Sequence, residues 1–297
     1  MTRWLILQSD YGQLGNRLHT QANALAWCIE NKINLLNLGF LSSSSLFLQQ
    51  ETIPIHLWFS SKSFLNRIFI KTNEGSFVNR LARSNKYLSQ IRRWVKVLET
   101  PDNEYLTEED LKKYFKEDQS KPIILSRAWD LRCPHALTTH QDKIRKLLSP
   151  RASLGNPTEE RIAKLKQTFG LLVGVHARRG DYRQFLDGIH FHNWSEYKKW
   201  MIQIKRLLEQ KAGKSVGFLL CSDEPPPIES FDELPVTTFR ETEPMIDLHA
   251  LSLCDYNIGP PSSFGTWLSF HGRVPRLTIT AGTEIDSLDQ FTLTRHC

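Results

Sequence analysis

Two adjacent arginines carry the strongest chemical signal in this sequence. They lie in the segment His176 to Tyr182, which reads HARRGDY and begins at the last residue of the mostly apolar run 171–176. That run is typical of a buried strand, and open α/β sheets bind ligands beyond the carboxyl ends of their strands. Because guanidinium groups stay charged and pair two oxygens at once, Arg178 and Arg179 are suited to hold a diphosphate. The alternative is that they pair with Asp181 and other surface acids.

A second segment has groups that could receive phosphate oxygens. Ser262, Ser263 and Phe264 follow a predicted strand at 256–259 and begin a predicted helix. Hydroxyl groups and free N–H groups at a helix N-terminus bind phosphate oxygens. The alternative is a serine that only caps the helix, which stabilises it by about 1 kcal/mol.

Two further segments follow predicted strands. Asp223 comes after the run 216–221, at the end of a predicted strand. A carboxylate at such a position commonly accepts hydrogen bonds from a ribose or a base. The alternative is an aspartate that only caps a turn or a helix. The loop 10–16, DYGQLGN, joins the first strand to the first helix and is not a GxGxxG fingerprint. Gly15 and its neighbouring glycine would still let a ligand approach the backbone, with Asn16 reaching toward it.

Several kinds of site are absent from the sequence. It contains no Walker, GxSxG or HExxH motif and no Asp-x-Asp pair, so the usual means of holding a divalent metal on a diphosphate is missing. The five cysteines are scattered without a CxxC pair, which disfavours a zinc site or a disulfide framework and fits a reducing compartment. We therefore expect no metal and no cofactor, with arginines and helix N-termini neutralising the phosphate charge.

The elements that position these residues alternate between strand and helix. Strands are predicted at 4–8, 33–38, 121–125, 171–176, 216–221, 235–239, 256–259 and 276–280, and helices at 16–30, 141–148, 158–169, 194–210, 247–254 and from about 262. This alternation predicts an α/β fold with parallel sheets. Residues 151–158 have the composition of a linker, which predicts two Rossmann-like domains, 1–155 and 156–297, facing a cleft.

Composition excludes several broad classes. The 297 residues carry 38 Lys+Arg and 32 Asp+Glu, a net charge of +6, with 40% hydrophobic residues. That balance excludes wholesale disorder, and no apolar run is long enough to span a membrane. The pI of about 9.0 suggests an anionic partner, but the basic residues lack the aromatic interleaving of a nucleic-acid groove. The basic stretch 80–96 could instead contact an anionic membrane.

In order and spacing, these segments resemble the fucosyltransferase superfamily, most closely the bacterial α-1,2-fucosyltransferase family. Its HxRRGDY motif is matched in full by 176–182, and its Gly-x-x-Gly-Asn loop, Ser-Asp segment and Ser-Ser-Phe segment are matched at 12–16, 222–223 and 262–264. The resemblance covers the C-terminal half and the first thirty residues. It implies a GT-B-like fold, with residues 1–155 as the acceptor domain and 156–297 as the donor domain.

The family resemblance also implies an activity. It is the inverting, metal-independent transfer of L-fucose from GDP-β-L-fucose to a hydroxyl of an oligosaccharide or glycolipid, with α-1,2 linkage as the expectation. Arg178 and Arg179 fall on the arginines that hold the diphosphate, and Asp187 is our candidate for the general base. The remaining donor-binding positions are Gly15, Asn16, His176, Asp181, Asp223, Ser262, Ser263 and Phe264.

The sequence departs from the family at two places, and alternatives stay open. Arg17 and Thr266 stand in segments where the family has other residues, so the acceptor and linkage are undetermined. The alternatives are a transferase that uses another GDP-sugar and a non-catalytic relative that binds nucleotide or glycan. No nucleic-acid partner is expected. The predicted location is the cytoplasm, at the periphery of the inner face of the membrane.

Overall fold

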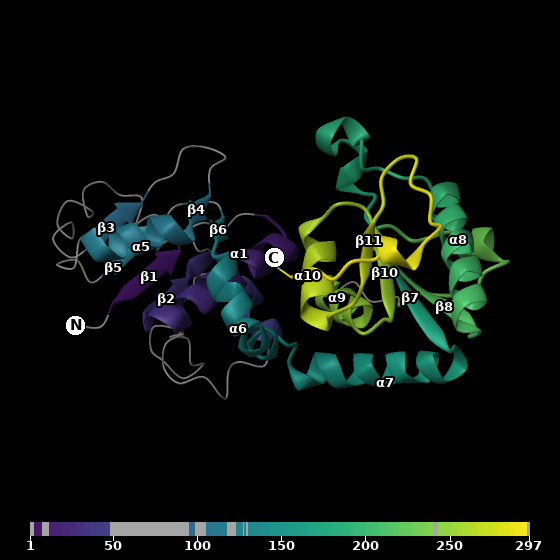
Figure 1. Cartoon of the computed structure of the whole chain (residues 1–297), viewed down its shortest axis with the longest axis horizontal. Coiled ribbons are helices and arrows are strands. Elements are labelled where there is room, and N and C mark those ends of the chain that lie inside the picture. The colour runs from purple at the N-terminus through teal and green to yellow at the C-terminus, as the bar shows by residue number, and fades with distance from the viewer. Residues whose placement is uncertain are drawn as a thin grey trace. The chain divides into compact units, whose positions relative to one another are not determined.

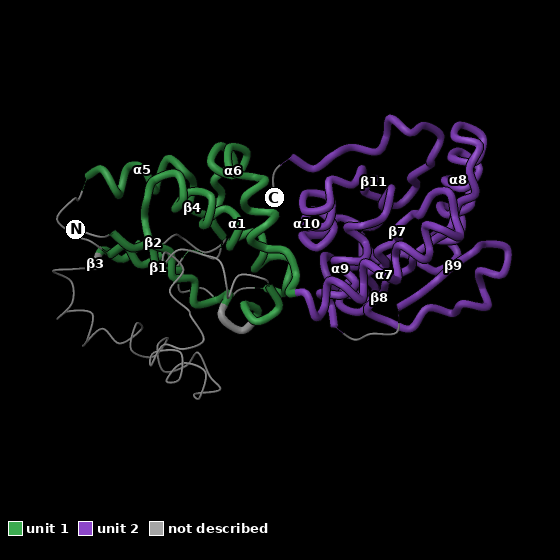
Figure 2. The backbone as a smooth tube through the Cα atoms, turned by 90° about the horizontal axis from the view of Figure 1, so that it is seen from below, with its two compact units in different colours: residues 1–151, 296 green, residues 152–295, 297 purple. Residues whose placement is uncertain are grey.

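The computed structural model describes residues 3–7, 12–47, 95–98, 105–117, 123–126, 128, 130–239 and 243–295. The chain divides into two compact units, residues 1–151 and 152–295 (Figure 2). Each unit has its own sheet of parallel strands with helices packed against it (Figure 1).

The sheet of unit 2 has the strand order of a Rossmann fold. Its order β11-β10-β7-β8-β9 corresponds, in chain order, to 5-4-1-2-3, and every pair is parallel. The strand order reverses between β7 and β10, which is where doubly wound sheets bind their ligands. The strands are β7 (Leu171–Ala177), β8 (Val216–Ser222), β9 (Val236–Thr237), β10 (Tyr256–Gly259) and β11 (Arg276–Thr278).

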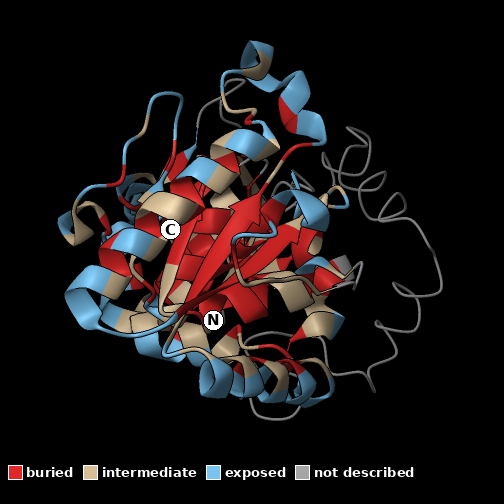
Figure 3. Ribbon diagram, turned by 90° about the vertical axis from the view of Figure 1, so that its right-hand side faces the viewer, coloured by how far each residue is buried: buried red, intermediate tan, exposed pale blue. Residues whose placement is uncertain are grey.

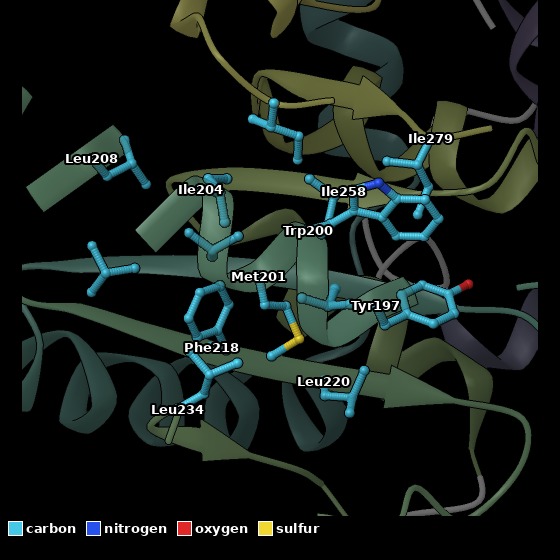
Figure 4. Packing of buried hydrophobic residues seen from close by; sticks show 14 of the residues in the cluster. Tyr197, Trp200, Met201, Ile204, Leu208, Phe218, Leu220, Leu234, Ile258 and Ile279 are labelled. Carbon is cyan, nitrogen blue, oxygen red and sulfur yellow. The ribbon is translucent and has the colours of Figure 1, made fainter. Parts of the chain in front are cut away.

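Side chains of β7 alternate between two hydrophobic layers, as a strand buried on both faces requires. Val173 and Val175 pack in the layer under α8 (Trp194–Ala212), whose Tyr197, Met201 and Ile204 face the sheet (Figure 4). Leu172 packs on the other face, with α7 (Ala152–Thr168), α9 (Pro244–Ser252) and α10 (Ser263–Gly272). Buried residues are therefore concentrated in the strands, and the outer sides of the helices are exposed (Figure 3).

The sheet of unit 1 is also parallel, in the order β2-β1-β5-β3. Its strands are β1 (Trp4–Leu7), β2 (Asn34–Asn37), β3 (Val95–Leu98) and β5 (Ile123–Ser126), with a two-stranded pair β4 (Leu106–Thr107) and β6 (Leu131–Arg132). Its helices are α1 (Leu14–Asn31), α5 (Glu108–Glu117) and α6 (Pro134–Leu147), and η1 (Leu38–Leu46) is a 3-10 helix. The first strand, helix and second strand confirm the sequence prediction.

Two sequence predictions about the junction of the units are wrong. Residues 152–158 are not a linker, because α7 begins at Ala152 and continues through Pro157. Proline has no backbone N–H to donate to the Ser153 carbonyl, yet the helix continues, and in the next position the Thr158 hydroxyl donates to the Leu154 carbonyl at 2.8 Å. The helix expected at 141–148 begins earlier, at Pro134, because proline is well accommodated at the first position of a helix.

Among the described residues, no helix combines the length and the apolar character needed to cross a bilayer. The basic stretch 80–96 lies outside the described residues, except for its last two positions. The described cysteines, Cys28, Cys133, Cys221 and Cys254, are buried free thiols.

Candidate active site

Two of the predicted segments meet where the strand order of unit 2 reverses. The arginine turn 178–180 follows β7, and residues 260–262 lead from β10 into α10. The Tyr182 hydroxyl donates to the Pro261 carbonyl at 2.6 Å, and the His176 ring stacks on Phe264 with centroids 4.6 Å apart. Since β7 and β10 are adjacent parallel strands, their carboxyl ends bring these two segments to the same edge of the sheet.

Asp223, at the end of β8, holds the arginine turn from the other side. One carboxylate oxygen accepts the backbone N–H of Arg179 at 2.8 Å, and the other accepts that of Gly180 at 3.0 Å. A Cβ at Gly180 would lie 3.1 Å from the same carboxylate, so this position favours a residue without a side chain. The turn-capping alternative for Asp223 is therefore present in the structure.

Arg178 forms a two-point ion pair with Asp181. Its Nε donates to Oδ1 at 2.9 Å and its Nη2 donates to Oδ2, while the guanidinium carbon lies 4.6 Å from the centre of the Tyr182 ring. The hydrogen bonds from Arg178 lower the pKa of Asp181 below its ordinary value. With Nε and Nη2 used, Nη1 of Arg178 makes no hydrogen bond to the described residues, and the side chain is 18% exposed.

Arg179 has a different environment, because its side chain is buried. Its Nε donates to Glu224 at 3.1 Å, its Nη1 donates to the His192 carbonyl, and its guanidinium carbon lies 4.3 Å from the centre of the Trp194 ring. These contacts fix the guanidinium on the α8 side of the turn.

Glu224 is a site residue that sequence reasoning missed. It accepts two hydrogen bonds from Nη2 of Arg183, both at 2.8 Å, in addition to the bond from Arg179. The hydrogen bonds from Arg183, followed by that from Arg179, lower the pKa of Glu224. Its position directly after Asp223, at the end of a predicted strand, was the available signal.

His176 is buried beneath the arginine turn and is neutral at ordinary pH. Burial, reinforced by the nearby charges of Arg276 and Arg178, lowers its pKa to about 3. Its Nδ1 is buried without a hydrogen-bond partner.

Ser262 caps α10 in the way the alternative interpretation expected. Its hydroxyl accepts the backbone N–H of Gly265 at 2.9 Å, in extended backbone conformation. Ser263 and Phe264 are the first two residues of the helix, and Phe264 stacks on His176. The start of this helix therefore packs against the end of β7.

The remaining predicted residues lie on other segments of the chain. Asp187 is exposed and lies in a 3-10 segment (Phe185–Gly188), where Leu186 and Asp187 both have left-handed backbone angles, φ 50° and 55°. Gly15 and Asn16 are in α1 of unit 1. Within the described ranges, no group of three or more His, Cys, Asp or Glu side chains has the arrangement of a metal site.

No protein-family model matches the chain, and no curated protein sequence matches it either. Solved structures do match its fold. A mutant of Arabidopsis thaliana FUT1 in complex with GDP is 12% identical, with a TM-score of 0.61, and the match covers 100% of this chain and 75% of FUT1. POFUT1 in complex with GDP-fucose is 13% identical, with a TM-score of 0.56 and coverage of 95% and 98%.

NodZ alpha-1,6-fucosyltransferase soaked with GDP-fucose is 15% identical, with a TM-score of 0.51 and coverage of 98% and 97%. At these identities the likeness concerns the fold. The predicted GT-B-like α/β fold is confirmed.

Proposed function

We propose that this protein is an inverting, metal-independent fucosyltransferase that moves L-fucose from GDP-β-L-fucose to a hydroxyl of a glycan. The observation that carries the proposal is the junction of the arginine turn with the start of α10 at the strand-order reversal of unit 2. A fold shared with FUT1 bound to GDP and with POFUT1 bound to GDP-fucose supports a GDP-sugar as donor.

The proposed chemistry follows the charge that develops during transfer. As the bond between fucose and the β-phosphate breaks, negative charge grows on the departing phosphate and positive charge grows on the sugar. A fixed cation and the N-terminus of α10 would stabilise that phosphate more in the transition state than in the ground state. Nη1 of Arg178 is the donor that its pair with Asp181 leaves available.

The two arginines have separate roles in this proposal. Arg178 would contact the diphosphate, held in place by Asp181. Arg179, whose guanidinium is engaged by Glu224 and His192, would fix the shape of the turn. The nucleoside would lie near Asp223, and Ser262, Ser263 and Phe264 would present the start of α10 to the phosphates.

Arg178→Ala tests the role of the first arginine. Loss of one group that stabilises developing charge is expected to lower turnover by about 10²–10³-fold. Arg206→Ala, on the exposed side of α8, is the matched control and should keep full turnover. An Arg178→Ala enzyme within about tenfold of the parent, equivalent to some 1.4 kcal/mol, would contradict the assignment.

We further propose Asp187 as the base that removes the proton of the acceptor hydroxyl. It is exposed at the tip of the segment that follows the arginine turn, where an incoming hydroxyl could reach it. Asp187→Asn keeps the shape and removes the basicity, so turnover with an acceptor should fall while GDP affinity is retained. Normal turnover of Asp187→Asn would remove this residue from the mechanism.

The acceptor is proposed to be an oligosaccharide or glycolipid, received in α-1,2 linkage by unit 1. Gly15 and Asn16, at the start of α1, are proposed to bind the donor. A lipid-linked acceptor would place the protein in the cytoplasm, at the periphery of the membrane. Linkage analysis of the product, and binding to anionic vesicles with and without neutralisation of the basic stretch 80–96, test these two proposals separately.

A thermal-shift screen against GDP, UDP, ADP and CMP tests the donor class. Selective stabilisation by GDP is expected, and turnover should then be compared with GDP-fucose and GDP-mannose. Higher turnover with GDP-mannose would favour the alternative of another GDP-sugar transferase. GDP binding without transfer to any glycan would favour a non-catalytic relative, and a response only to oligonucleotides would refute the proposal.

A further inference from the structure

Arg276 is a buried arginine behind the junction of the arginine turn and α10. It begins β11 and is 7% exposed. Its Nη2 donates to the carbonyls of Gly259 at 2.9 Å and Pro260 at 2.7 Å, and its Nη1 donates to the Thr278 hydroxyl. The side chain therefore holds the backbone that leads from β10 into α10.

The charge of Arg276 is not balanced by any described residue. No carboxylate in the described ranges lies within ion-pair distance of it, and its Nε is buried without a hydrogen-bond partner. The titratable groups that face it are His176, Tyr182 and Tyr197, which are all neutral at pH 7. Burial lowers the pKa of Arg276 to about 10, so the side chain stays protonated.

The other arginines of the site differ in this respect. Arg178 is paired with Asp181, and Arg179 and Arg183 share Glu224. Arg276 is hydrogen-bonded but has no counter-ion among the described residues, and a buried charge without a counter-ion destabilises a protein by several kcal/mol. Its presence therefore points to a function or to an anion that binds later.

A glycine of α10 makes room for this guanidinium. A Cβ at Gly265, in the first turn of α10, would lie 2.5 Å from Nη2 and 2.7 Å from Nε. At Gly259, the last residue of β10, a Cβ would instead crowd the His176 carbonyl at 2.8 Å, and its 3.4 Å distance from Nη2 would be an ordinary contact. Helix, strand and arginine are therefore fitted to one another around the buried charge.

We propose that Arg276 is the uncompensated cation of the phosphate site: it fixes the turn that starts α10, and the donor's diphosphate balances its charge. This inference rests on the proposed function for the identity of the donor. Arg276 is a positioning residue, because it holds the Gly259 and Pro260 carbonyls and acts on the phosphates through its electrostatic field. Its field adds to that of the helix N-terminus, and both act in an interior where charges are weakly screened.

The test compares the affinities of the full chain for GDP, guanosine and inorganic pyrophosphate by calorimetry. In Arg276→Gln, affinity for GDP and pyrophosphate is expected to fall about tenfold or more, because a buried charge facing an anion is lost. Affinity for guanosine should stay within about twofold, since a neutral ligand does not experience that charge. Arg206→Gln, an exposed arginine on α8, should bind all three like the parent.

Two variants keep a positive charge at position 276. They distinguish an effect of that charge on anion binding from a loss of structure. Arg276→Lys should recover much of the GDP affinity lost in Arg276→Gln. Gly265→Ala, whose Cβ would displace the guanidinium while favouring the helix, should lose GDP affinity and retain guanosine affinity. These two keep the inference testable if Arg276→Gln fails to fold.

The outcomes distinguish the inference from the proposed function. Unchanged GDP and pyrophosphate affinity in Arg276→Gln, or an equal loss for guanosine, would overturn the role of Arg276 alone. A parent protein that binds pyrophosphate but not GDP, with pyrophosphate binding lost in Arg276→Gln, would support Arg276 and refute the GDP-sugar donor. A parent that binds neither anion would overturn both.

Discussion

Removal of the Asp223 carboxylate tests how the arginine turn is held. Asp223→Ala deletes the acceptor of two backbone N–H groups, those of Arg179 and Gly180. Hydrogen bonds to charged groups contribute about 1.5–3 kcal/mol each. The Arg179 N–H is partly buried and the Gly180 N–H is exposed, so water can replace only the second bond fully. We therefore expect the turn to lose about 2–3 kcal/mol of local stability.

Amide hydrogen exchange in the absence of nucleotide measures this loss directly. A loss of about 2–3 kcal/mol corresponds to exchange that is about 30- to 150-fold faster, since 1.36 kcal/mol is a factor of ten. The peptide that spans the arginine turn should show this change, and peptides from α7 should not. Asp223→Asn keeps one acceptor oxygen and should lose about 1 kcal/mol.

Asp232→Asn is the matched control, because it removes an exposed carboxylate of the same unit and changes the net charge equally. In this variant the amide hydrogens of the arginine turn should exchange as fast as in the parent. If Asp223→Ala left exchange at the turn unchanged and lowered only GDP affinity, Asp223 would act on the nucleoside rather than on the turn, and the reasoning would be refuted.

Three further predictions concern the charges around this turn. Hydrogen bonds from Arg183 lower the pKa of Glu224 below its ordinary value of 4.5. The ionised carboxylate therefore stabilises the fold above pH 4.5, and this stabilisation is lost as the pH falls through the lowered pKa. Glu224→Gln should therefore flatten the fall of the thermal midpoint below pH 5, and an unchanged profile would contradict this. The pKa of His176 is about 3, against 6.5 ordinarily, so between these values the unfolded chain binds the extra proton and acidification destabilises the fold. His176→Phe should weaken that slope, and in the parent the NMR signals of the His176 imidazole should not titrate near pH 6.5. Arg179→Met should lower the free energy of unfolding in urea by about 1–3 kcal/mol, because the His192 carbonyl loses its donor. A change under about 0.5 kcal/mol would mean that these contacts stabilise little.

The sequence predicted the elements of unit 2 well, because their signals are local. Apolar runs such as 171–177 and 216–222 are long enough to be recognised as buried strands. Asn193 and Gly213 stand at the two ends of α8, where capping residues belong. The predicted starts of two other helices, α6 and α7, are too late. Pro134 occupies the first turn of α6, where proline is favourable, and α7 continues through Pro157, although proline is more typical of a linker.

The order of the motifs along the chain also indicated where the site would be. Parallel strands place their carboxyl ends on one edge of the sheet, so segments that follow β7, β8 and β10 meet there regardless of their separation in sequence. The predicted parallel strands therefore favour one common edge for the arginine turn, Asp223 and the start of α10, and the strand order that makes them neighbours comes from the structure.

Only the tertiary structure decided which charge pairs with which. Glu224 engages Arg179 from 45 residues away, whereas Arg178 pairs locally with Asp181, and both arrangements fit the same HARRGDY segment. The burial of Arg276 depends on β11 lying beside β10 and on the space left by Gly265. Local sequence determines which conformation a segment favours, but the pairing and desolvation of a charge depend on every element packed around it, and these come from distant parts of the chain.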